Sequence, residues 1–293
     1  MKDWTLAFPS SGIYQAEALT FGSPRSRYVM TAMPAVDSPE FTTDDTSNVR
    51  ADGITFGTDA LGSTTVSFAL ETNGVTDDDG VELYEELRRT WRADAVRLDP
   101  GKVATLTSHH GRRAFGRPRR ISRDARFSHV GRSAVTADFK TVDDLWYGPE
   151  RSAEVKLIPE LGGGLTAPLV APLTTTASSD RSTYIDVGGK LPTWATIEVY
   201  GDIVRPEVEV VGVLRMTWDL ALAYDQKLVA DARPWVRSIL RNGESVAGSV
   251  SRDSTSILRL LLPPGRYPLA LRGASQSGTA RAIVRWSDAF TTY

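Results

Sequence analysis

Few side chains in this sequence could form a metal site or a proton-transfer site. The chain has no cysteine, which excludes disulfides, thiolate metal ligands, iron–sulfur clusters and cysteine nucleophiles. Its three histidines are His109, His110 and His129. Adjacent residues of a strand point to opposite faces, so His109 and His110 are not expected to chelate one metal together. We therefore expect no metal, no cofactor and no catalytic residues, and we predict that the protein is not an enzyme.

Paired carboxylates are another common source of catalysis, and one pair stands beside aromatic residues. Asp143 and Asp144 precede Trp146 and Tyr147, a cluster that could suit a sugar in a glycan hydrolase. Such a cluster more often closes the edge of a domain, and we favour this structural interpretation over the hydrolase. The sequence has no Gly-x-Ser-x-Gly elbow, and its Gly162-Gly163-Gly164 run lacks the ending of a phosphate-binding loop.

The strongest local charge anomaly is an arginine-rich stretch between residues 112 and 132. Three interpretations are open: a subunit interface that binds carboxylates of a neighbouring copy, a solvated loop, and a site that neutralises nucleic-acid phosphates. The net charge of −2 argues against a protein built to coat nucleic acid. We therefore favour the interface, with an acidic face between Asp77 and Glu86 as its complement. The interface candidates are Arg112, Arg113, Arg117, Arg119, Arg120, Arg123 and Arg126.

Tryptophans concentrate in the second half of the chain. Trp194, Trp218, Trp235 and Trp286 all fall there. If exposed, Trp194, Trp218 and Trp235 would be glycan-stacking candidates and the protein would bind host cell-wall glycan. If buried, the same residues would form the core of a small β-sandwich, which is the interpretation we favour.

Most of the sequence has the pattern of short strands separated by turns. Residues 64–70 alternate between apolar and polar, the mark of a strand with one buried face. Turn residues such as Asp52-Gly53, Asn73-Gly74 and Asn242-Gly243 separate such segments. This spacing predicts a mainly β protein with antiparallel sandwiches or barrels, of which we favour two sandwiches. Further strands are predicted at residues 102–107, 134–139, 153–158, 184–187, 195–200, 207–213, 227–231, 257–262 and 281–286.

One helix is predicted at about residues 78–94. The acidic run Asp77-Asp78-Asp79 favours a helix start, and Val81, Tyr84, Leu87 and Trp91 follow at helical spacing. A calcium loop is the weaker alternative for the acidic run, because its alternating ligands and closing glutamate are missing.

The length of 293 residues corresponds to two domains, which we place at residues 1–150 and 151–293. Connector-like composition follows the first domain, at residues 161–165 and 174–179. The sequence begins without an apolar run behind a basic start, and no apolar stretch approaches the ~20 residues of a membrane span. We therefore expect no signal peptide, no membrane partner and synthesis in a cytoplasm.

Several segments of the second domain resemble distal tail proteins of siphophages. The ordered set comprises Val199-Tyr200-Gly201-Asp202-Ile203-Val204-Arg205-Pro206-Glu207-Val208, Asp231-Ala232-Arg233-Pro234, Leu240-Arg241-Asn242-Gly243, Leu262-Pro263-Pro264-Gly265-Arg266-Tyr267-Pro268-Leu269 and residues 278–286. In the first domain, Phe115-Gly116-Arg117-Pro118-Arg119 and a later Asp138-Phe139 are similar to distal tail proteins of actinobacterial phages.

The resemblance implies a structural role in a virion. Distal tail proteins form a ring, a hexamer in this family, that joins the tail tube protein to the tail hub or receptor-binding apparatus. The resemblance also implies that the first domain, a sandwich with one helix, builds the ring and that the second is a galectin-like, jelly-roll-like sandwich. It places the protein at the distal tail tip, made in the cytoplasm of a bacterial host, with no nucleic acid as a partner.

Overall fold

The computed structural model describes residues 3–124, 130–157, 183–275 and 278–293. The fold is mainly β with antiparallel strand pairing and one long helix, which confirms the fold class predicted from the sequence. The chain divides into two compact units. Unit 1 comprises Met1–Pro149 together with Phe290–Tyr293, and unit 2 comprises Glu150–Ala289. No helix in the described ranges combines the length and apolar character needed to cross a membrane.

Unit 1 is built on one antiparallel sheet with the strand order β2–β1–β10–β11–β12–β9. A further bridge joins Gly22 at the end of β2 to Val29 in β3, so the sheet curls back on itself around a core. Strands β3 and β4 pair with the other edge of β9. The bounds are β1 (Trp4–Phe8), β2 (Glu17–Phe21), β3 (Tyr28–Met30), β4 (Ala35–Val36), β9 (Thr65–Thr72), β10 (Ala104–Thr107), β11 (Arg113–Asp124) and β12 (Ala134–Thr141).

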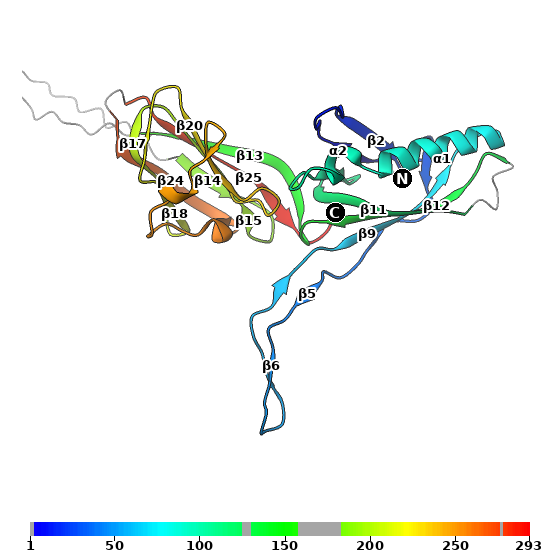
Figure 1. Ribbon diagram of the computed structural model, residues 1–293, viewed down its shortest axis with the longest axis horizontal. Helices are drawn as coiled ribbons and strands as arrows, with labels where there is room; N and C mark the ends of the chain where they lie inside the picture. The colour runs from blue at the N-terminus through cyan, green and yellow to red at the C-terminus, as the bar shows by residue number, and fades with distance from the viewer. Residues whose placement is uncertain (1–2, 125–129, 158–182, 276–277) are drawn as a thin grey trace, which may run out of the picture. The chain divides into compact units, whose positions relative to one another are not determined.

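The long helix α1 (Asp77–Trp91) packs against this sheet and is followed by the short helix α2 (Asp94–Arg97) (Figure 1). A capping box starts α1, because Thr76 Oγ1 accepts a hydrogen bond from the Asp79 amide while Asp79 Oδ2 accepts one from the Thr76 amide. Leu83, Leu87 and Trp91 are buried. Val81, which the sequence pattern placed on the apolar face, is exposed, so the buried stripe is shifted from the predicted one.

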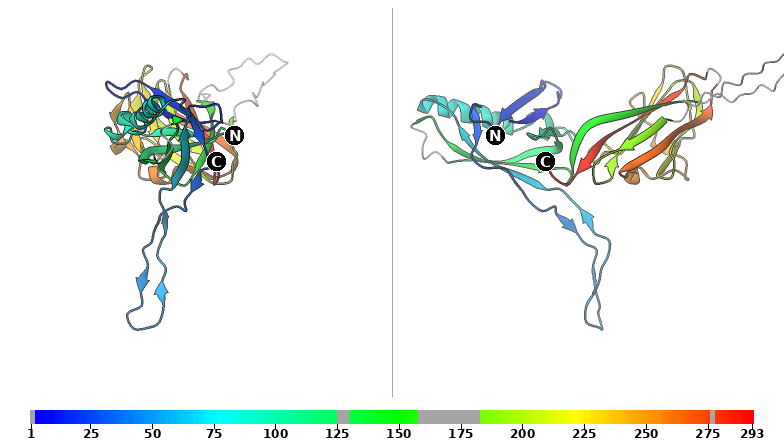
Figure 2. Two further views of the ribbon diagram at one scale, coloured as in Figure 1. Left: turned by 90° about the vertical axis from the view of Figure 1, so that its right-hand side faces the viewer. Right: turned by 180° about the vertical axis from the view of Figure 1, so that it is seen from behind.

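Unit 1 also carries a long two-stranded projection that the sequence analysis did not predict. We call residues 37–63 the arm; it contains the paired strands β5 (Phe41–Thr42) and β8 (Ala60–Leu61), and β6 (Thr46–Ser47) and β7 (Ile54–Thr55). The turn at its tip contains Gly53, whose φ of +103° suits glycine. Every residue from 40 to 61 is exposed. The arm leaves unit 1 beyond β9 and extends away from the sheet (Figures 1 and 2).

Unit 2 is a β-sandwich of two antiparallel sheets. One sheet has the order β13–β25–β16–β20–β21–β22, and the other has the order β14–β24–β17–β18 with β19 also on β17. Buried side chains of both sheets, including Ile197, Val208 and Met216, form one core. The bounds are β13 (Trp146–Lys156), β14 (Thr183–Val187), β15 (Thr193–Trp194), β16 (Thr196–Tyr200), β17 (Ile203–Val210), β18 (Leu214–Thr217), β19 (Ala221–Leu222), β20 (Lys227–Asp231), β21 (Ser238–Arg241), β22 (Glu244–Ser245), η3 (Ala247–Ser249), η4 (Ile257–Arg259), β23 (Leu261–Leu262), β24 (Gly265–Ala274) and β25 (Arg281–Phe290).

The predicted strand at residues 257–262 is wrong over most of its length. Residues Ile257–Arg259 form the 3₁₀ helix η4, and only Leu261–Leu262 pair as a strand. The two predicted connectors, at residues 161–165 and 174–179, lie outside the described residues.

Candidate functional site

Arg113–Asp124 of the arginine-rich stretch form the strand β11, and most of the described arginine side chains of the stretch serve the fold of unit 1. Arg117 Nε and Nη2 donate hydrogen bonds to the Lys102 carbonyl at 2.9 and 2.7 Å, and Nη2 also donates to the Asp99 carbonyl at 2.7 Å. Arg113 Nη2 donates to the Gly148 carbonyl at 2.7 Å. Burial, reinforced by the charge of Arg119, lowers the pKa of Arg117.

Two further candidates are also held within unit 1. Arg112 Nη1 donates to the Thr292 carbonyl at 2.7 Å, and its guanidinium lies 3.8 Å from the centre of the Phe290 ring. Arg123 Nε donates to Ser133 Oγ at 3.0 Å, and its guanidinium lies 5.0 Å from the Tyr84 ring centre. These arginines connect separate parts of unit 1, so their guanidinium groups are not free for a neighbour.

Arg119 and Arg120 differ from the rest of the stretch. Both are exposed, and neither side chain makes a hydrogen bond or an ion pair within the described residues. They stand where the register between β11 and β12 shifts, between Pro118 and Ile121. Such irregularities turn side chains away from the regular ladder. Arg126 lies outside the described residues.

The acidic face suggested as the complement of these arginines lies on α1. Asp77, Asp78, Glu82 and Glu85 are exposed there. The Asp79 side chain already accepts a hydrogen bond from the Thr76 amide in the capping box. The Glu86 side chain also has partners within unit 1, because it binds Arg27 Nη1 at 2.8 Å and accepts a hydrogen bond from the Tyr28 hydroxyl. Burial of Tyr28, together with the Glu86 charge, raises the pKa of that hydroxyl.

Residues 143–147, the aromatic and acidic cluster, form hydrogen bonds with one another. Tyr147 donates its hydroxyl to Asp143 Oδ2 at 2.5 Å, and Asp143 Oδ1 accepts from the Leu145 amide at 3.2 Å. Trp146 is buried. This arrangement fixes a chain turn and matches the structural interpretation of the cluster.

The histidines in the described ranges have packing contacts. His109 lies 5.7 Å from the Trp4 ring and 4.0 Å from the His110 ring, in the turn before β11. His129 lies outside the described residues. No group of three or more histidine, aspartate or glutamate side chains suited to a metal ion occurs in the part of the chain that the structure describes.

The tryptophan candidates in unit 2 do not form an exposed platform. Trp218 is fully buried, so it cannot stack on a sugar. Trp194 is partly buried and packs against the core, and the partly buried Trp235 lies 5.7 Å from the Arg233 guanidinium. Trp286 is buried as well. Trp218 and Trp286 are thus core residues and Trp194 packs against that core, so Trp218 was wrong as a glycan-stacking candidate.

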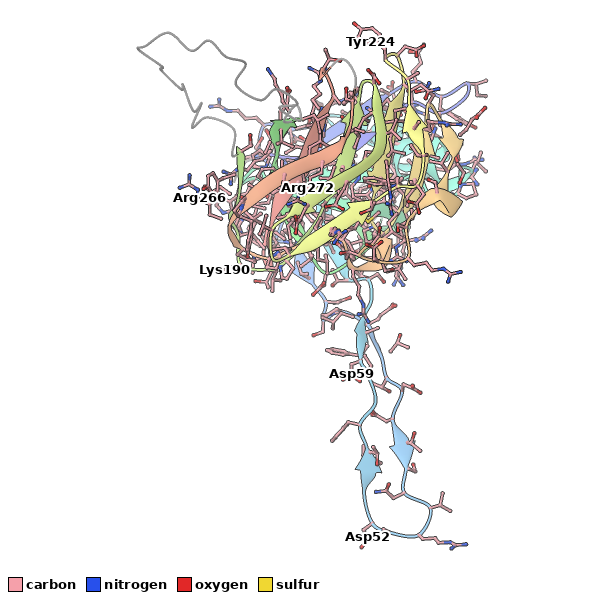
Figure 3. The ribbon with its side chains drawn as sticks, turned by 90° about the vertical axis from the view of Figure 1, so that its left-hand side faces the viewer. Asp52, Asp59, Lys190, Tyr224, Arg266 and Arg272 are labelled. Carbon is pink, nitrogen blue, oxygen red and sulfur yellow. The ribbon has the colours of Figure 1, made fainter. Side chains whose placement is uncertain are left out.

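The arm is the surface that sequence reasoning missed. Its large apolar side chains that are half or more exposed are Phe41, Val49, Ile54, Phe56 and Leu61. It also carries six carboxylates and one arginine, Arg50, a net charge of −5 (1 − 6). Figure 3 shows the side chains of the arm, Asp52 and Asp59 among them, pointing away from the hairpin on both sides. The only signal in the sequence was the Asp52-Gly53 turn, which predicts a hairpin.

One ion pair fixes the root of the arm to the sheet. Lys140 Nζ of β12 lies 2.8 Å from Glu40 Oε1. The hydrogen bond from Lys140 and its charge lower the pKa of Glu40. Backbone hydrogen bonds between Glu40 and residues 62 and 63 close the two chains of the root.

Comparison with solved structures shows that the fold is similar to that of phage tail proteins. No protein-family model matches the chain, and no curated protein does. The Dit protein of phage SPP1, a paradigm of the hub adsorption apparatus in phages that infect Gram-positive hosts, matches with a TM-score of 0.59 at 14% identity, over 98% of this chain and 99% of that one. The chain has the fold of a phage distal tail protein.

The distal-tail fold extends over both units. A chain of the phage P2 baseplate in its activated conformation matches over 97% of this chain and 98% of that one, with TM-scores of 0.52 in the calcium-containing structure and 0.53 in the strontium-containing structure, each at 12% identity. The resemblance drawn from the sequence is thus confirmed for the fold.

Proposed function

We propose that the protein is a structural, non-enzymatic component of a phage tail tip, located at the distal end of the tail in the virion. The observation that carries this proposal is the likeness to the SPP1 Dit protein over nearly the full length of both chains. The described residues add support, because the candidate acids and tryptophans have structural contacts.

The finer proposal is that copies of the chain close into a hexameric ring that joins the tail tube protein to the tail hub or receptor-binding apparatus. A ring contact is heterologous, so each copy needs two different surfaces that complement each other. The arm supports such an assembly. A two-stranded hairpin is at best marginally stable alone in water, and this one exposes several large apolar side chains. A partner that covers the arm would stabilise the hairpin and would remove its apolar side chains from water.

Arg119 and Arg120 are the arginines that we propose for the subunit interface. Both are exposed and have no partner within the described residues, whereas Arg112, Arg113, Arg117 and Arg123 are used inside unit 1. The exposed acids of α1, such as Glu82 and Glu85, supply opposite charge. Guanidinium–carboxylate pairs add orientation and specificity to an interface.

Assembly of the purified full-length chain tests the ring. We expect light scattering over a range of concentrations to give the mass of an oligomer, and electron microscopy to show closed rings. Replacing Arg119 and Arg120 together by glutamate should raise the concentration needed for half-assembly about tenfold, because like charges then face the acids. Arg252 and Arg259 of unit 2 are exposed as well, so their paired replacement by glutamate is the control with the same charge change. An unchanged oligomer mass in the Arg119/Arg120 variant would remove these residues from the interface.

The location in the virion is tested separately. Gold-labelled antibodies against the chain should bind at the distal end of the tail in electron micrographs of intact virions. Labelling of capsids or of fibres instead would overturn the tail-tip proposal.

A further inference from the structure

A recess lies between the turn that joins β1 to β2 and the C-terminal end of α1. It has a volume of about 510 Å³, and we call it the α1-end groove. Ile13 at its rim is 90% exposed, while Tyr14 beside it packs against the core of unit 1. Its apolar lining includes Phe8, Ile13, Tyr14, Ala16, Ala93 and Ala95. A recess of this size with an apolar floor can receive a large side chain.

The charged side chains that line this groove are Arg89, Glu17 and Asp94, and the helical segment beside it is rich in arginine. Residues 88–97 contain four arginines and one acid, Asp94, a net charge of +3 (4 − 1). Asp94 binds both Arg92 and Arg97, and Arg89 binds Glu17 across the groove at 3.0 Å. Arg88 is exposed, and its side chain has no ion pair or hydrogen bond in the described part of the chain. Arg88 immediately precedes the groove-lining Arg89 on α1 and therefore offers a positive charge close to the groove.

The arm has the complementary composition. It exposes Phe41 by 63% and Phe56 by 78%, and its net charge is −5. Asp44 of the arm has no ion pair or side-chain hydrogen bond within the described residues. An apolar ring flanked by carboxylates suits a partly apolar recess beside an arginine-rich helix end, because the recess buries the ring while the arginines beside it select the orientation.

The arm cannot enter the groove of its own copy. Figures 1 and 2 show that α1 and α2 lie on one side of the unit 1 sheet, whereas the arm leaves on the other side and extends away. We propose that the α1-end groove receives the arm of a second copy of the chain, with Phe41 or Phe56 in the recess and Asp44 facing Arg88. The proposal rests on the proposed function, and it names the surface that accepts the arm when the ring forms.

The absence of native cysteine makes a cross-linking test straightforward. The test variant carries Ile13→Cys and Phe56→Cys in one chain and is treated with a short bis-maleimide. We expect covalent dimers and longer chains of copies on a denaturing gel, because each groove then lies beside a neighbour's arm. The matched control carries Val81→Cys and Phe56→Cys, since Val81 is exposed near the opposite end of α1. The control should give little or no ladder.

The outcomes separate this proposal from the proposed function. If light scattering shows the oligomer but the Ile13/Phe56 variant gives no ladder, or the control gives an equal one, the groove is not the acceptor and the ring proposal stands. If the unmodified chain does not associate at any concentration, the ring proposal fails and the groove proposal fails with it.

Charge exchange provides a second test that needs no cross-linker. Arg88→Glu alone and Asp44→Arg alone should each raise the concentration for half-assembly several-fold, and combining them in one chain should restore it. Only a direct interaction predicts this restoration, because independent sites give additive effects. Additive weakening in the double variant would overturn the assigned contact between Asp44 and Arg88.

Discussion

Arginine side chains in unit 1 act mainly as bridges between distant stretches of backbone. The Arg117 guanidinium reaches two carbonyl oxygens in the segment before β10, and Arg112 reaches the carbonyl of Thr292. The planar fork of arginine makes such multiple bonds possible, which the single ammonium of lysine cannot reproduce. An arginine-rich stretch can therefore be a structural feature even where its charge suggests a binding surface.

Replacing Arg117 by lysine should destabilise unit 1. The lysine would lose at least one of the bonds to the carbonyls of Asp99 and Lys102, which corresponds to a loss of about 1–2 kcal/mol in the free energy of unfolding. Urea denaturation measures this loss. Arg119→Lys is the matched control, because Arg119 makes no hydrogen bond within the described residues, and its unfolding midpoint should not move. Equal midpoints for both variants would show that the bonds of Arg117 add no stability.

Glu198 gives unit 2 a predicted pH dependence. This buried carboxylate accepts from the Tyr200 hydroxyl at 2.7 Å and binds Lys227 Nζ at 3.0 Å and Arg285 Nε at 3.5 Å. Burial alone would raise its pKa, but these hydrogen bonds and charges together lower it below the ordinary value of 4.5. Its ionised form therefore stabilises the fold above pH 4.5, and that contribution disappears as the pH falls through the lowered pKa.

Glu198→Gln tests this effect. At neutral pH the variant should unfold at a lower urea concentration than the unmodified chain, and the difference should shrink as the pH falls below the ordinary glutamate pKa. Glu244→Gln, at an exposed position of β22, is the control and should show no such change. A difference that does not depend on pH would exclude the ionised carboxylate as its cause.

At the scale of elements, local patterns predicted most strands and the helix. The strand predicted at residues 227–231 has the observed bounds, and alternation at residues 64–70 marks the buried face of β9. Residues 257–262 contain several apolar side chains, but Ile257–Arg259 form a 3₁₀ helix and only Leu261–Leu262 pair as a strand. An apolar run does not by itself distinguish the periodicity of a strand from that of a helix.

The arm and the contacts of the arginines could not be predicted from local pattern. The strand pairs of the arm are only two residues long and bury no face, so no alternation marks them. The partners of Arg112 and Arg113 lie 180 and 35 residues away, respectively, and only the folded chain brings them together. Sequence therefore located the charged stretch correctly but could not separate Arg119 and Arg120, which have no partner within the described residues, from the arginines bound inside unit 1.

The start of α1 provides a test at this scale. Thr76→Ala removes the side-chain oxygen that accepts from the Asp79 amide, and we expect a loss of about 1 kcal/mol in the free energy of unfolding of unit 1. Thr76→Ser keeps this oxygen and should behave like the unmodified chain. Thermal unfolding followed by circular dichroism measures both, and equal stability of the alanine variant would show that the capping box adds nothing.

At the scale of the whole molecule, we expect the arm to contribute to assembly and not to the folding of unit 1. Replacing residues 38–62 by Asn-Gly joins the chain at the root, where Asp37 already pairs with Thr65. The core of unit 1 contains no residue of the arm, so the shortened chain should unfold at nearly the same temperature. It should remain monomeric by light scattering where the full chain associates. Assembly that survives the deletion would show that the arm is not a subunit contact.

The division of the chain has a consequence for synthesis on the ribosome. Tyr293 packs against Trp4 and Trp146, with ring centres 5.1 and 5.5 Å apart, yet the whole of unit 2 is translated between Pro149 and Phe290. Unit 1 therefore lacks its final aromatic contact until unit 2 has emerged, and unit 2 is in sequence terms a nested insert. Any replacement of unit 2 must therefore supply two chain ends that join unit 1 at the same two positions.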